Sequence, residues 1–199
     1  MDTIRFFDIL FAVIGLIVLS PLFIIIALCI KLTSAGPVFF RQVRVGRFGK
    51  DFRLFKFRSM YVNAEAKGQL TVGGRDSRIS TVGYYLRKFK LDELPQFINV
   101  LFGDMSFVGP RPEVRKYVDL YTEDQRKVLT VLPGITDYAS IAYRNENELL
   151  SKAANPEQFY ITDIMPRKIE LNYRFINERS LGKYFYILLT TVITAIKGK

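Results

Sequence analysis

A long apolar stretch near the start of the chain constrains the fold more than any other feature. Residues Ile9 to Ile30 are almost entirely apolar. At about 1.5 Å of rise per residue, a helix of this length just crosses a hydrocarbon core of roughly 30 Å. The stretch is too long for the apolar region of a cleaved signal peptide, and no small-residue cleavage site follows it. We therefore expect a membrane helix over residues 1–34, followed by a membrane-associated folded domain over 35–199.

Ser20 and Pro21 lie at the centre of this stretch and are expected to break the helix. Pro21 has no N–H to donate to the carbonyl of Ile17, and its ring pushes the helix off its axis. Within a bilayer the freed carbonyl needs another donor, and the Ser20 hydroxyl is well placed to supply it. Two arrangements fit: a kinked single span with the N-terminus outside, or a re-entrant helix that dips in and returns to the same face.

The distribution of charge predicts that most of the chain is cytoplasmic. Basic residues follow the apolar segment between Lys31 and Lys50, and an excess of Lys and Arg marks the cytoplasmic side in either arrangement. On the other flank, Arg5 and Asp8 are spaced to pair at i, i+3, which slightly favours the shallow dip. The formal net charge of +10 indicates an anionic partner, such as nucleic acid, anionic lipid or a phosphorylated substrate.

The chain contains no histidine and one cysteine, Cys29. These counts exclude Ser-His-Asp and Cys-His mechanisms, histidine-ligated metals, intramolecular disulfides and cysteine-cluster zinc sites. Any acid, base, nucleophile or metal ligand must therefore come from the carboxylates, lysine, Ser, Thr, Tyr or the backbone.

The remaining pattern predicts a mixed α/β fold that is mostly helical, with a small strand element and amphipathic helices at the membrane interface. Alternating apolar and basic residues predict short strands over 38–40 and 52–58. Helices are expected over 82–88 with Ser80 or Thr81 as N-cap, from Asp92 to Gly103 with Asp92 as N-cap, over 113–132, over 159–175 limited by Pro166, and over 184–196. A helix is also expected to start over 61–66, and 71–75 to form a loop.

The basic and aromatic residues of the predicted strand over 52–58 are compatible with more than one function. Such a strand face can serve nucleic acid, lipid headgroups or a pyrophosphate. A membrane-tethered nucleic-acid binder and a non-catalytic membrane scaffold are therefore alternatives to an enzyme. The last helix is too short to span a bilayer, so it packs in the core or lies at the interface, where its terminal lysines can meet anionic headgroups.

The stretch from Leu91 to Pro112 concentrates the residues that can do chemistry. Asp92 and Glu93 are adjacent carboxylates, and Arg111 lies between two prolines. At a helix start, free N–H groups and the helix dipole favour a nearby phosphate. One carboxylate could then attack phosphorus while the other holds Mg²⁺, which prefers oxygen ligands, and Arg111 could bind phosphate oxygens in a bidentate fork. The same residues also fit an ordinary cap, a first-turn acid and a surface arginine.

Together these motifs closely resemble the bacterial sugar transferase family, the monotopic polyprenyl-phosphate phosphoglycosyl transferases, in its minimal single-domain form. The resemblance covers nearly the whole chain. The residues that carry it are Arg5-Phe6-Phe7-Asp8, Ser20-Pro21, Phe55-Lys56-Phe57-Arg58-Ser59-Met60, Asp76-Ser77-Arg78-Ile79, Gly83, Leu86-Arg87, Leu91-Asp92-Glu93-Leu94-Pro95-Gln96, Asn99-Val100-Leu101, Gly103-Asp104-Met105-Ser106, Val108-Gly109-Pro110-Arg111-Pro112 and Pro133-Gly134-Ile135-Thr136.

The resemblance implies transfer of a phosphosugar from a nucleotide diphosphate sugar, usually a UDP-sugar, to polyprenyl (undecaprenyl) phosphate. UMP leaves, and the product starts the assembly of capsule, O-antigen, exopolysaccharide or glycoprotein glycans. By this resemblance Asp92 is the nucleophile that carries a covalent phosphosugar, and Glu93 helps to bind a required Mg²⁺. The residues expected to bind substrate or phosphate are Arg87, Arg111, Lys56, Arg78 and Arg144.

The family's Ser-Pro pair bends a re-entrant helix, so the resemblance favours the dip over the span. It implies a location at the bacterial inner membrane, with the catalytic domain on the cytosolic face, in contact with membrane lipids and with no nucleic-acid partner. One-step transfer with Asp92 as general base is the alternative chemistry. A homodimer is left open.

One segment departs from the family pattern. After Pro-Gly-Ile-Thr the family commonly has Gly-Trp-Ala-Gln and then Val-Asn-Gly-Arg, whereas this chain has Asp137-Tyr138-Ala139-Ser140-Ile141-Ala142-Tyr143-Arg144. This segment is linked with donor binding, so the departure bears on which sugar is transferred. Phe89-Lys90 also replaces small hydroxyl residues that are usual before the Leu-Asp-Glu run.

Overall fold

The computed structural model describes residues 2–64, 70 and 76–197. Within these residues the fold is mostly helical, with two sheets of two strands each. The mixed, mostly helical fold class is therefore confirmed. The helix start expected over 61–66 falls partly outside the described residues, and the loop expected over 71–75 falls wholly outside them.

After residue 136 every described element is a helix, and helices and strands alternate only over residues 96–142. In order they are α1 (Thr3–Val18), α2 (Ser20–Thr33), β1 (Phe39–Val45), β2 (Asp51–Phe57), α3 (Thr81–Lys88), α4 (Gln96–Phe102), β3 (Ser106–Val108), α5 (Arg115–Val118), β4 (Gly134–Thr136), α6 (Tyr138–Ala142), α7 (Glu146–Ser151), α8 (Pro156–Phe159), α9 (Met165–Asn177) and α10 (Leu181–Lys197). Short 3₁₀ turns are η1 (Arg47–Gly49), η3 (Leu91–Glu93) and η4 (Gln125–Thr130), and η5 (Tyr160–Ile164) is a π-helical turn.

The apolar segment is broken where the sequence predicts it. α1 ends at Val18, α2 begins at Ser20, and the two helices are bent by 60° relative to each other. The Ser20 hydroxyl donates to the carbonyl of Ile17 at 2.8 Å, the group that Pro21 leaves without its helical donor. No described helix has by itself the length and apolar composition needed to cross a membrane, whereas the bent pair taken together does.

Arg5 attaches the first turns of α1 to α4. Its guanidinium donates to the carbonyls of Val100 at 2.6 Å and Leu101 at 3.1 Å. These carbonyls belong to the last turn of α4, where backbone acceptors lack helical partners and a cation is favourable. The helix stops at Gly103, which has a φ of 90°, so the predicted glycine end of this helix is confirmed.

Asp8 attaches α1 to β3 and α10. Its buried Oδ1 accepts hydrogen bonds from the Ser106 hydroxyl at 3.0 Å, the Phe107 N–H at 3.0 Å and the Tyr184 hydroxyl at 2.9 Å. The predicted ion pair between Asp8 and Arg5 is therefore wrong. Arg5 and Asp8 instead bind polar groups that lie far away in the sequence. Those groups would otherwise lack a hydrogen-bond partner inside the fold.

The other end of the broken segment is tied to the same folded body. Arg58 donates to the carbonyls of Ser34 at 2.7 Å and Ala35 at 2.6 Å, directly after α2. Ile30 of α2 packs in one apolar cluster with Phe57 of β2. Both ends of the α1–α2 pair thus contact the domain that follows them.

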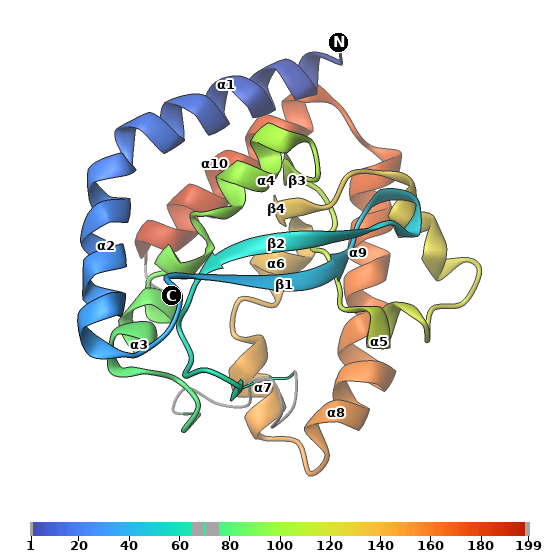
Figure 1. The fold of residues 1–199 in the computed structure, drawn as a ribbon. Coiled ribbons are helices and arrows are strands. Elements are labelled where there is room, and N and C mark those ends of the chain that lie inside the picture. Colours follow the sequence, from blue (N-terminus) through green and yellow to red (C-terminus); the bar gives the residue numbers. More distant parts are fainter. Residues whose placement is uncertain (1, 65–69, 71–75, 198–199) are drawn as a thin grey trace.

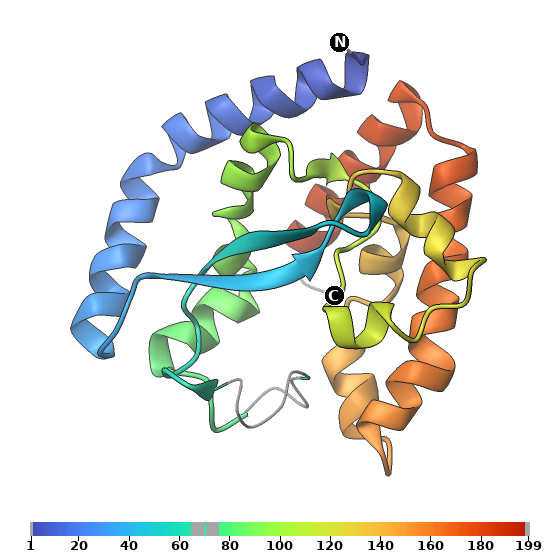
Figure 2. The ribbon, with the colours of Figure 1, turned by 45° about the vertical axis from the view of Figure 1, so that its right-hand side comes forward.

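β1 and β2 form an antiparallel hairpin that crosses the molecule between α1–α2 on one side and α8–α9 on the other (Figures 1 and 2). Both predicted strands are confirmed, although β1 is longer than expected. Asn99 of α4 accepts from the Phe55 N–H at 2.9 Å and donates to the Arg53 carbonyl at 2.8 Å. This two-way contact holds β2 on α4 and fixes the position of Lys56, the next residue of the strand.

β3 and β4 form a short parallel pair that brings the loop after β3 to the segment after β4. Ser106 pairs with Gly134, and Val108 pairs with Thr136. A Cβ atom at Gly134 would lie 2.1 Å from the backbone N of Gly109. Only glycine permits this approach, so the pair sets where the Pro110–Pro112 loop runs.

The predicted helix over 113–132 is wrong. Only α5 and the 3₁₀ turn η4 form within it, and the chain between them bends. The carbonyl of Glu113 accepts from the Val45 N–H at 2.9 Å, and its carboxylate accepts from the Tyr160 hydroxyl. Val114 is accordingly extended, with φ −75° and ψ 151°. Long-range hydrogen bonds override the helical spacing of the apolar residues.

The predicted helices over 82–88 and 184–196 are confirmed. The helix expected to start at Asp92 starts only at Gln96, and the one expected over 159–175 needs a correction at Pro166. Ser80 caps α3 by accepting from the Gly83 N–H at 3.0 Å, and α10 covers the predicted 184–196 helix. Pro166 does not limit the helix before it. The π-helical turn η5 leads directly into α9, whose first turn contains Pro166, and a first-turn proline needs no helical donor.

Replacing Asp8 tests the attachment of α1. In Asp8→Ala three buried donors lose their acceptor, so we expect the free energy of unfolding to fall by about 3 kcal/mol, measured by chemical or thermal unfolding in detergent. Asp2→Ala is the matched control: it removes a helix cap and an exposed ion pair with Arg179, which costs much less. Equal effects of the two substitutions would contradict the anchoring role of Asp8.

Candidate active site

Asp92 and Glu93 lie in the 3₁₀ turn η3 rather than at the start of a helix. Lys90, before the turn, has a left-handed φ of 57°. Pro95 has no N–H with which to continue an α-helical ladder, and α4 begins only after it. The prediction of Asp92 as an N-cap is therefore wrong. At about three residues per turn, the two neighbouring side chains point roughly 120° apart.

Glu93 is held by two cations from different parts of the fold. Lys56 Nζ of β2 lies 3.1 Å from Glu93 Oε1. Arg111 approaches bidentately: its Nη1 lies 3.1 Å from Oε2, and its Nη2 donates to Oε1. The structure thus brings three of the predicted site residues into one ion cluster, with both carboxylate oxygens of Glu93 engaged.

These contacts determine the protonation state of Glu93. Burial raises the pKa of Glu93, but the charges of Arg111 and Lys56 outweigh burial and hold the pKa well below the usual 4.5. Glu93 in turn raises the pKa of Arg111. Burial lowers the pKa of Lys56, and the charge of Glu93 opposes that shift. Glu93 is therefore a fixed anion at neutral pH.

Asp92 is buried beside this cluster in a different environment. It is 4% exposed, and no described residue donates a hydrogen bond to its carboxylate. Burial raises the pKa of Asp92 above 3.8, and the charge of Glu93 adds to this, while Lys56 and Arg87 lower it. The charge of Arg87, in the last turn of α3, therefore acts on Asp92, and its assignment to substrate stays a prediction. A carboxylate with uncommitted oxygens suits a nucleophile or a general base.

The two other predicted substrate-binding arginines make contacts of their own. Arg78 pairs with Asp76 at 2.6 Å and donates to the Leu70 carbonyl at 2.6 Å. Arg144 donates to the Thr194 carbonyl of α10 at 2.7 Å. Neither takes part in the described ion pairs of Glu93, and their assignment to substrate stays a prediction.

Sequence reasoning missed a second layer of charged residues behind Arg111. Arg44 of β1 donates to the Pro112 carbonyl at 3.0 Å and lies 3.8 Å from the carboxylate of Glu113. Asp137 accepts from the backbone N–H of Arg111 at 3.3 Å. Glu113 ends the proline-arginine run and Asp137 opens the atypical segment, so both positions carry a signal in the sequence. That signal does not reveal their partners.

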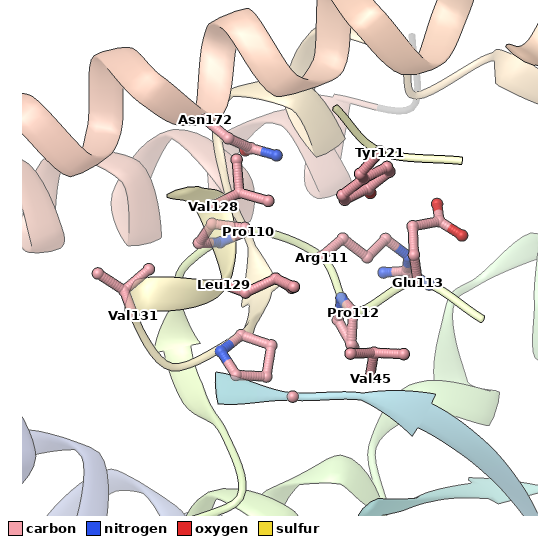
Figure 3. A pocket seen from close by; sticks show the side chains of 12 residues that line it. Val45, Pro110, Arg111, Pro112, Glu113, Tyr121, Val128, Leu129, Val131 and Asn172 are labelled. Carbon is pink, nitrogen blue, oxygen red and sulfur yellow. The ribbon is translucent and has the colours of Figure 1, made fainter. Parts of the chain in front are cut away.

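A small cavity of about 20 Å³ lies behind the Arg111 loop (Figure 3). Pro110, Arg111 and Tyr121 are among the residues that line it, and Asn172 of α9 projects toward it. The Oδ1 atom of Asn172 is buried without a partner among the described residues. The volume is enough for about one water molecule, so this cavity cannot hold a nucleotide sugar.

The sequence around this site matches a known protein family. The model of a family described as bacterial sugar transferase matches residues 2–198. The chain belongs to this family.

Individual relatives within the bacterial sugar transferase family agree with this assignment. The protein named UDP-N-acetylgalactosamine-undecaprenyl-phosphate N-acetylgalactosaminephosphotransferase of Aeromonas hydrophila is 40% identical over 197 residues, which cover 98% of this chain and 44% of the relative. The UDP-glucose:undecaprenyl-phosphate glucose-1-phosphate transferase of Escherichia coli K12 is 38% identical over 196 residues, or 96% and 40% of the two chains. An uncharacterized sugar transferase, EpsL, of Bacillus subtilis 168 is 43% identical over 141 residues, or 71% and 69%. The chain spans about two fifths of the length of the first two relatives.

The described residues of this sugar transferase family member allow one mode of Mg²⁺ binding. No group of three or more Asp, Glu, His or Cys residues among them is arranged to hold a metal ion. Mg²⁺ is often held by one or two carboxylates, with substrate phosphates completing its coordination. Asp92 and Glu93 fit that mode, although Glu93 has to give up a contact with Arg111 or Lys56 to join it.

Replacing Glu93 tests the ion cluster by its effect on stability. Glu93→Gln leaves two partly buried cations without their counter-charge, so we expect the free energy of unfolding at pH 7 to fall by about 2 kcal/mol. A folded-state pKa below 4.5 contributes stability above that pH, which is lost as the pH falls through the folded pKa. The difference from wild type should therefore shrink below pH 4.5, because protonated glutamate resembles glutamine.

The measurement is the free energy of unfolding of both proteins in detergent from pH 7 to pH 3. Glu123→Gln, at an exposed position, is the control and should stay close to wild type at every pH. A difference for Glu93→Gln that is independent of pH would contradict the ionised state assigned to Glu93.

Proposed function

We propose that this protein transfers a phosphosugar from a UDP-sugar to polyprenyl phosphate, with release of UMP, through a covalent intermediate on Asp92. The observation that carries this proposal is the contrast between the two adjacent carboxylates. Glu93 is committed through both oxygens to Arg111 and Lys56, whereas no described donor engages the carboxylate of Asp92. Membership of the family and the names of the relatives supply the substrate classes.

The chemistry divides into two displacements at the same phosphorus. A carboxylate oxygen of Asp92 attacks the phosphorus that carries the sugar, the bond to the bridging oxygen breaks, and UMP leaves with that oxygen. An oxygen of polyprenyl phosphate then attacks the same phosphorus, and the Asp92 carboxylate is released as the diphosphate product forms. Splitting one transfer into two displacements is the established use of a carboxylate nucleophile.

The cations around Glu93 suit the charge that this reaction develops. Arg111 presents a planar fork that matches phosphate oxygens, and Lys56 supplies a compact positive charge beside it. Both are already directed at an anion, Glu93, in a buried site, so they are preorganised to stabilise a bound diphosphate. Mg²⁺, when bound, would neutralise further charge on the phosphates.

We also propose that the α1–α2 pair is a re-entrant membrane helix on the cytosolic side of the bacterial inner membrane. Arg5, near the start of α1, and Ser34, just after α2, both bind the folded domain that follows. A segment whose two ends contact one domain fits a dip better than a span. Residues 1–34 then form the membrane helix, and 35–199 form the catalytic domain.

Exposed apolar side chains support contact of the same elements with lipid. Ile17 of α1 is 67% exposed and Leu28 of α2 is 57% exposed. On α10, Tyr184 is buried while Leu189 and Val192 are exposed, so this helix has a core face and an apolar outer face. Exposed apolar surface of this extent is typical of a membrane or protein contact.

Asp92→Asn tests the covalent step directly. Incubation of the purified protein with labelled UDP-sugars and Mg²⁺, without lipid acceptor, should give an adduct that mass spectrometry detects on Asp92. In Asp92→Asn we expect no adduct, and we expect transfer to polyprenyl phosphate to fall by at least about 10³-fold, since an amide does not replace the nucleophile.

Asp119→Asn, at an exposed position, is the matched control and should keep both activities. Lipid-dependent turnover without an adduct from any donor would favour one-step transfer with Asp92 as general base. Absence of any transfer by the wild-type protein would overturn the proposed function.

Cysteine labelling tests the topology. In a Cys29→Ser background, a single cysteine at Thr3 should react with a membrane-impermeant reagent only from the cytosolic side, because a re-entrant helix returns to the face it left. A cysteine at the exposed Lys50 marks the catalytic domain in the same assay. Labelling of position 3 from the periplasm alone would establish a span and refute the dip.

A further inference from the structure

The loop that carries Arg111 has very few backbone groups with which to hold its shape. Pro110 and Pro112 have no N–H, so the N–H of Arg111 is the one backbone donor of this three-residue loop. That N–H donates to the Oδ2 atom of Asp137 at 3.3 Å. A side chain, rather than a backbone carbonyl, therefore accepts from the one backbone donor of the loop.

The position of Asp137 follows from the pairing of β3 with β4. Just after β3, the Gly109 N–H donates to the Thr136 carbonyl of β4 at 3.0 Å, and the Gly134 N–H of β4 donates to the Pro110 carbonyl at 2.9 Å. After Thr136 the chain leaves the ladder to begin α6. The backbone at Asp137 no longer pairs with the described residues after β3. The Asp137 carboxylate instead accepts one further hydrogen bond from the Arg111 N–H.

Asp137 uses both of its oxygens. Oδ1 accepts from the Ser140 N–H at 2.5 Å and caps α6, while Oδ2 accepts from Arg111. The residue is fully buried, at 0% exposed. A carboxylate supplies two acceptors in a plane, whereas serine or asparagine at this position would supply one oxygen for two donors.

Pro110 and Pro112 are buried, and the loop also borders the small cavity (Figure 3). Among the described residues, each position of the loop makes one backbone hydrogen bond: the Gly134 N–H donates to the Pro110 carbonyl, the Arg111 N–H donates to Asp137, and Arg44 donates to the Pro112 carbonyl. Only the bond to Asp137 acts on the residue whose side chain reaches Glu93.

We propose that Asp137 is a positioning residue for Arg111. By holding the backbone N–H of Arg111, Asp137 fixes the point from which the guanidinium reaches Glu93 and the donor diphosphate. This inference rests on the proposed function, because it assigns Asp137 a role in binding the diphosphate of the donor. Asp137 acts on the donor only through Arg111 and not by direct contact. The segment over 137–144, which departs from the family pattern, thereby affects the donor site.

Binding of UDP in the presence of Mg²⁺ measures this role, because UDP carries the diphosphate without a sugar. The protein in detergent is titrated by calorimetry, and no transfer takes place because UDP has no phosphosugar to give. Asp137→Ala should raise the Kd for UDP about tenfold, the size expected for loss of one hydrogen bond to a binding group. In the presence of Arg111→Ala, the same substitution should change the Kd by less than about twofold.

The double-mutant cycle separates positioning from a general structural effect. A residue that acts only through Arg111 loses its influence when Arg111 is removed, whereas a structural defect weakens binding in both backgrounds. Equal effects of Asp137→Ala in the two backgrounds would overturn the inference. Should Asp137→Ala fail to fold, the same cycle is run with Asp137→Asn, which keeps a good N-cap for α6 but cannot accept both hydrogen bonds.

Asn155→Ala is the matched control. Asn155 caps α8 by accepting from the Gln158 N–H at 3.1 Å, the same i, i+3 relation as in Asp137 and Ser140, without contacting Arg111. Its removal should leave the Kd for UDP unchanged, and a tenfold increase there would also overturn the inference. Failure of the parent protein to bind UDP at all would instead overturn the donor class of the proposed function.

Discussion

The partly buried charge of Glu93 is the constraint on which the arrangement of the site depends. With 14% of its side chain exposed, this carboxylate stays ionised only with counter-charges in good geometry, and here they come from β2 and from the loop after β3. Each of these segments is itself held by a buried polar side chain: Asn99 binds β2, and Asp137 binds the loop. The ion cluster therefore draws three segments together, and hydrogen bonds outside it determine the precision of their approach.

A similar principle connects α1 to the rest of the fold. Arg5 donates hydrogen bonds to carbonyls at the end of α4. Asp8 accepts hydrogen bonds from side chains of β3 and α10. α4 follows the Asp92–Glu93 turn directly, and β3 leads into the Arg111 loop. The elements that bear the reactive groups are thus the ones against which α1 is fixed. Under the proposed function, this attachment would hold the Asp92–Glu93 turn and the Arg111 loop at a set position relative to α1, and so relative to the membrane that α1 is proposed to enter.

The sequence predicted best those features that depend on local chemistry. The break at Ser20 and Pro21, with the serine hydroxyl on the freed carbonyl, follows from proline geometry alone, and so does the glycine end of α4. Predictions failed where a distant partner decided the outcome. The Glu113 carbonyl is drawn to β1, so no long helix forms there, and Arg5 and Asp8 each find a buried partner. The family resemblance assigned Arg111 and Lys56 to the substrate and Glu93 to Mg²⁺, and neither that resemblance nor their spacing predicted that both cations pair with Glu93.

The two adjacent carboxylates differ because the fold treats them differently, although their sequence context is shared. The 3₁₀ turn directs them apart, and the cations fall on the side of Glu93. Burial then acts on both, but only at Glu93 do opposite charges outweigh it, so its pKa falls while that of Asp92 rises. Divergent titration of neighbouring acids is a general sign of divided roles. At this site the division places a fixed anion beside an uncommitted carboxylate, and the hydrogen bonds that hold Arg111 in place keep the two environments distinct.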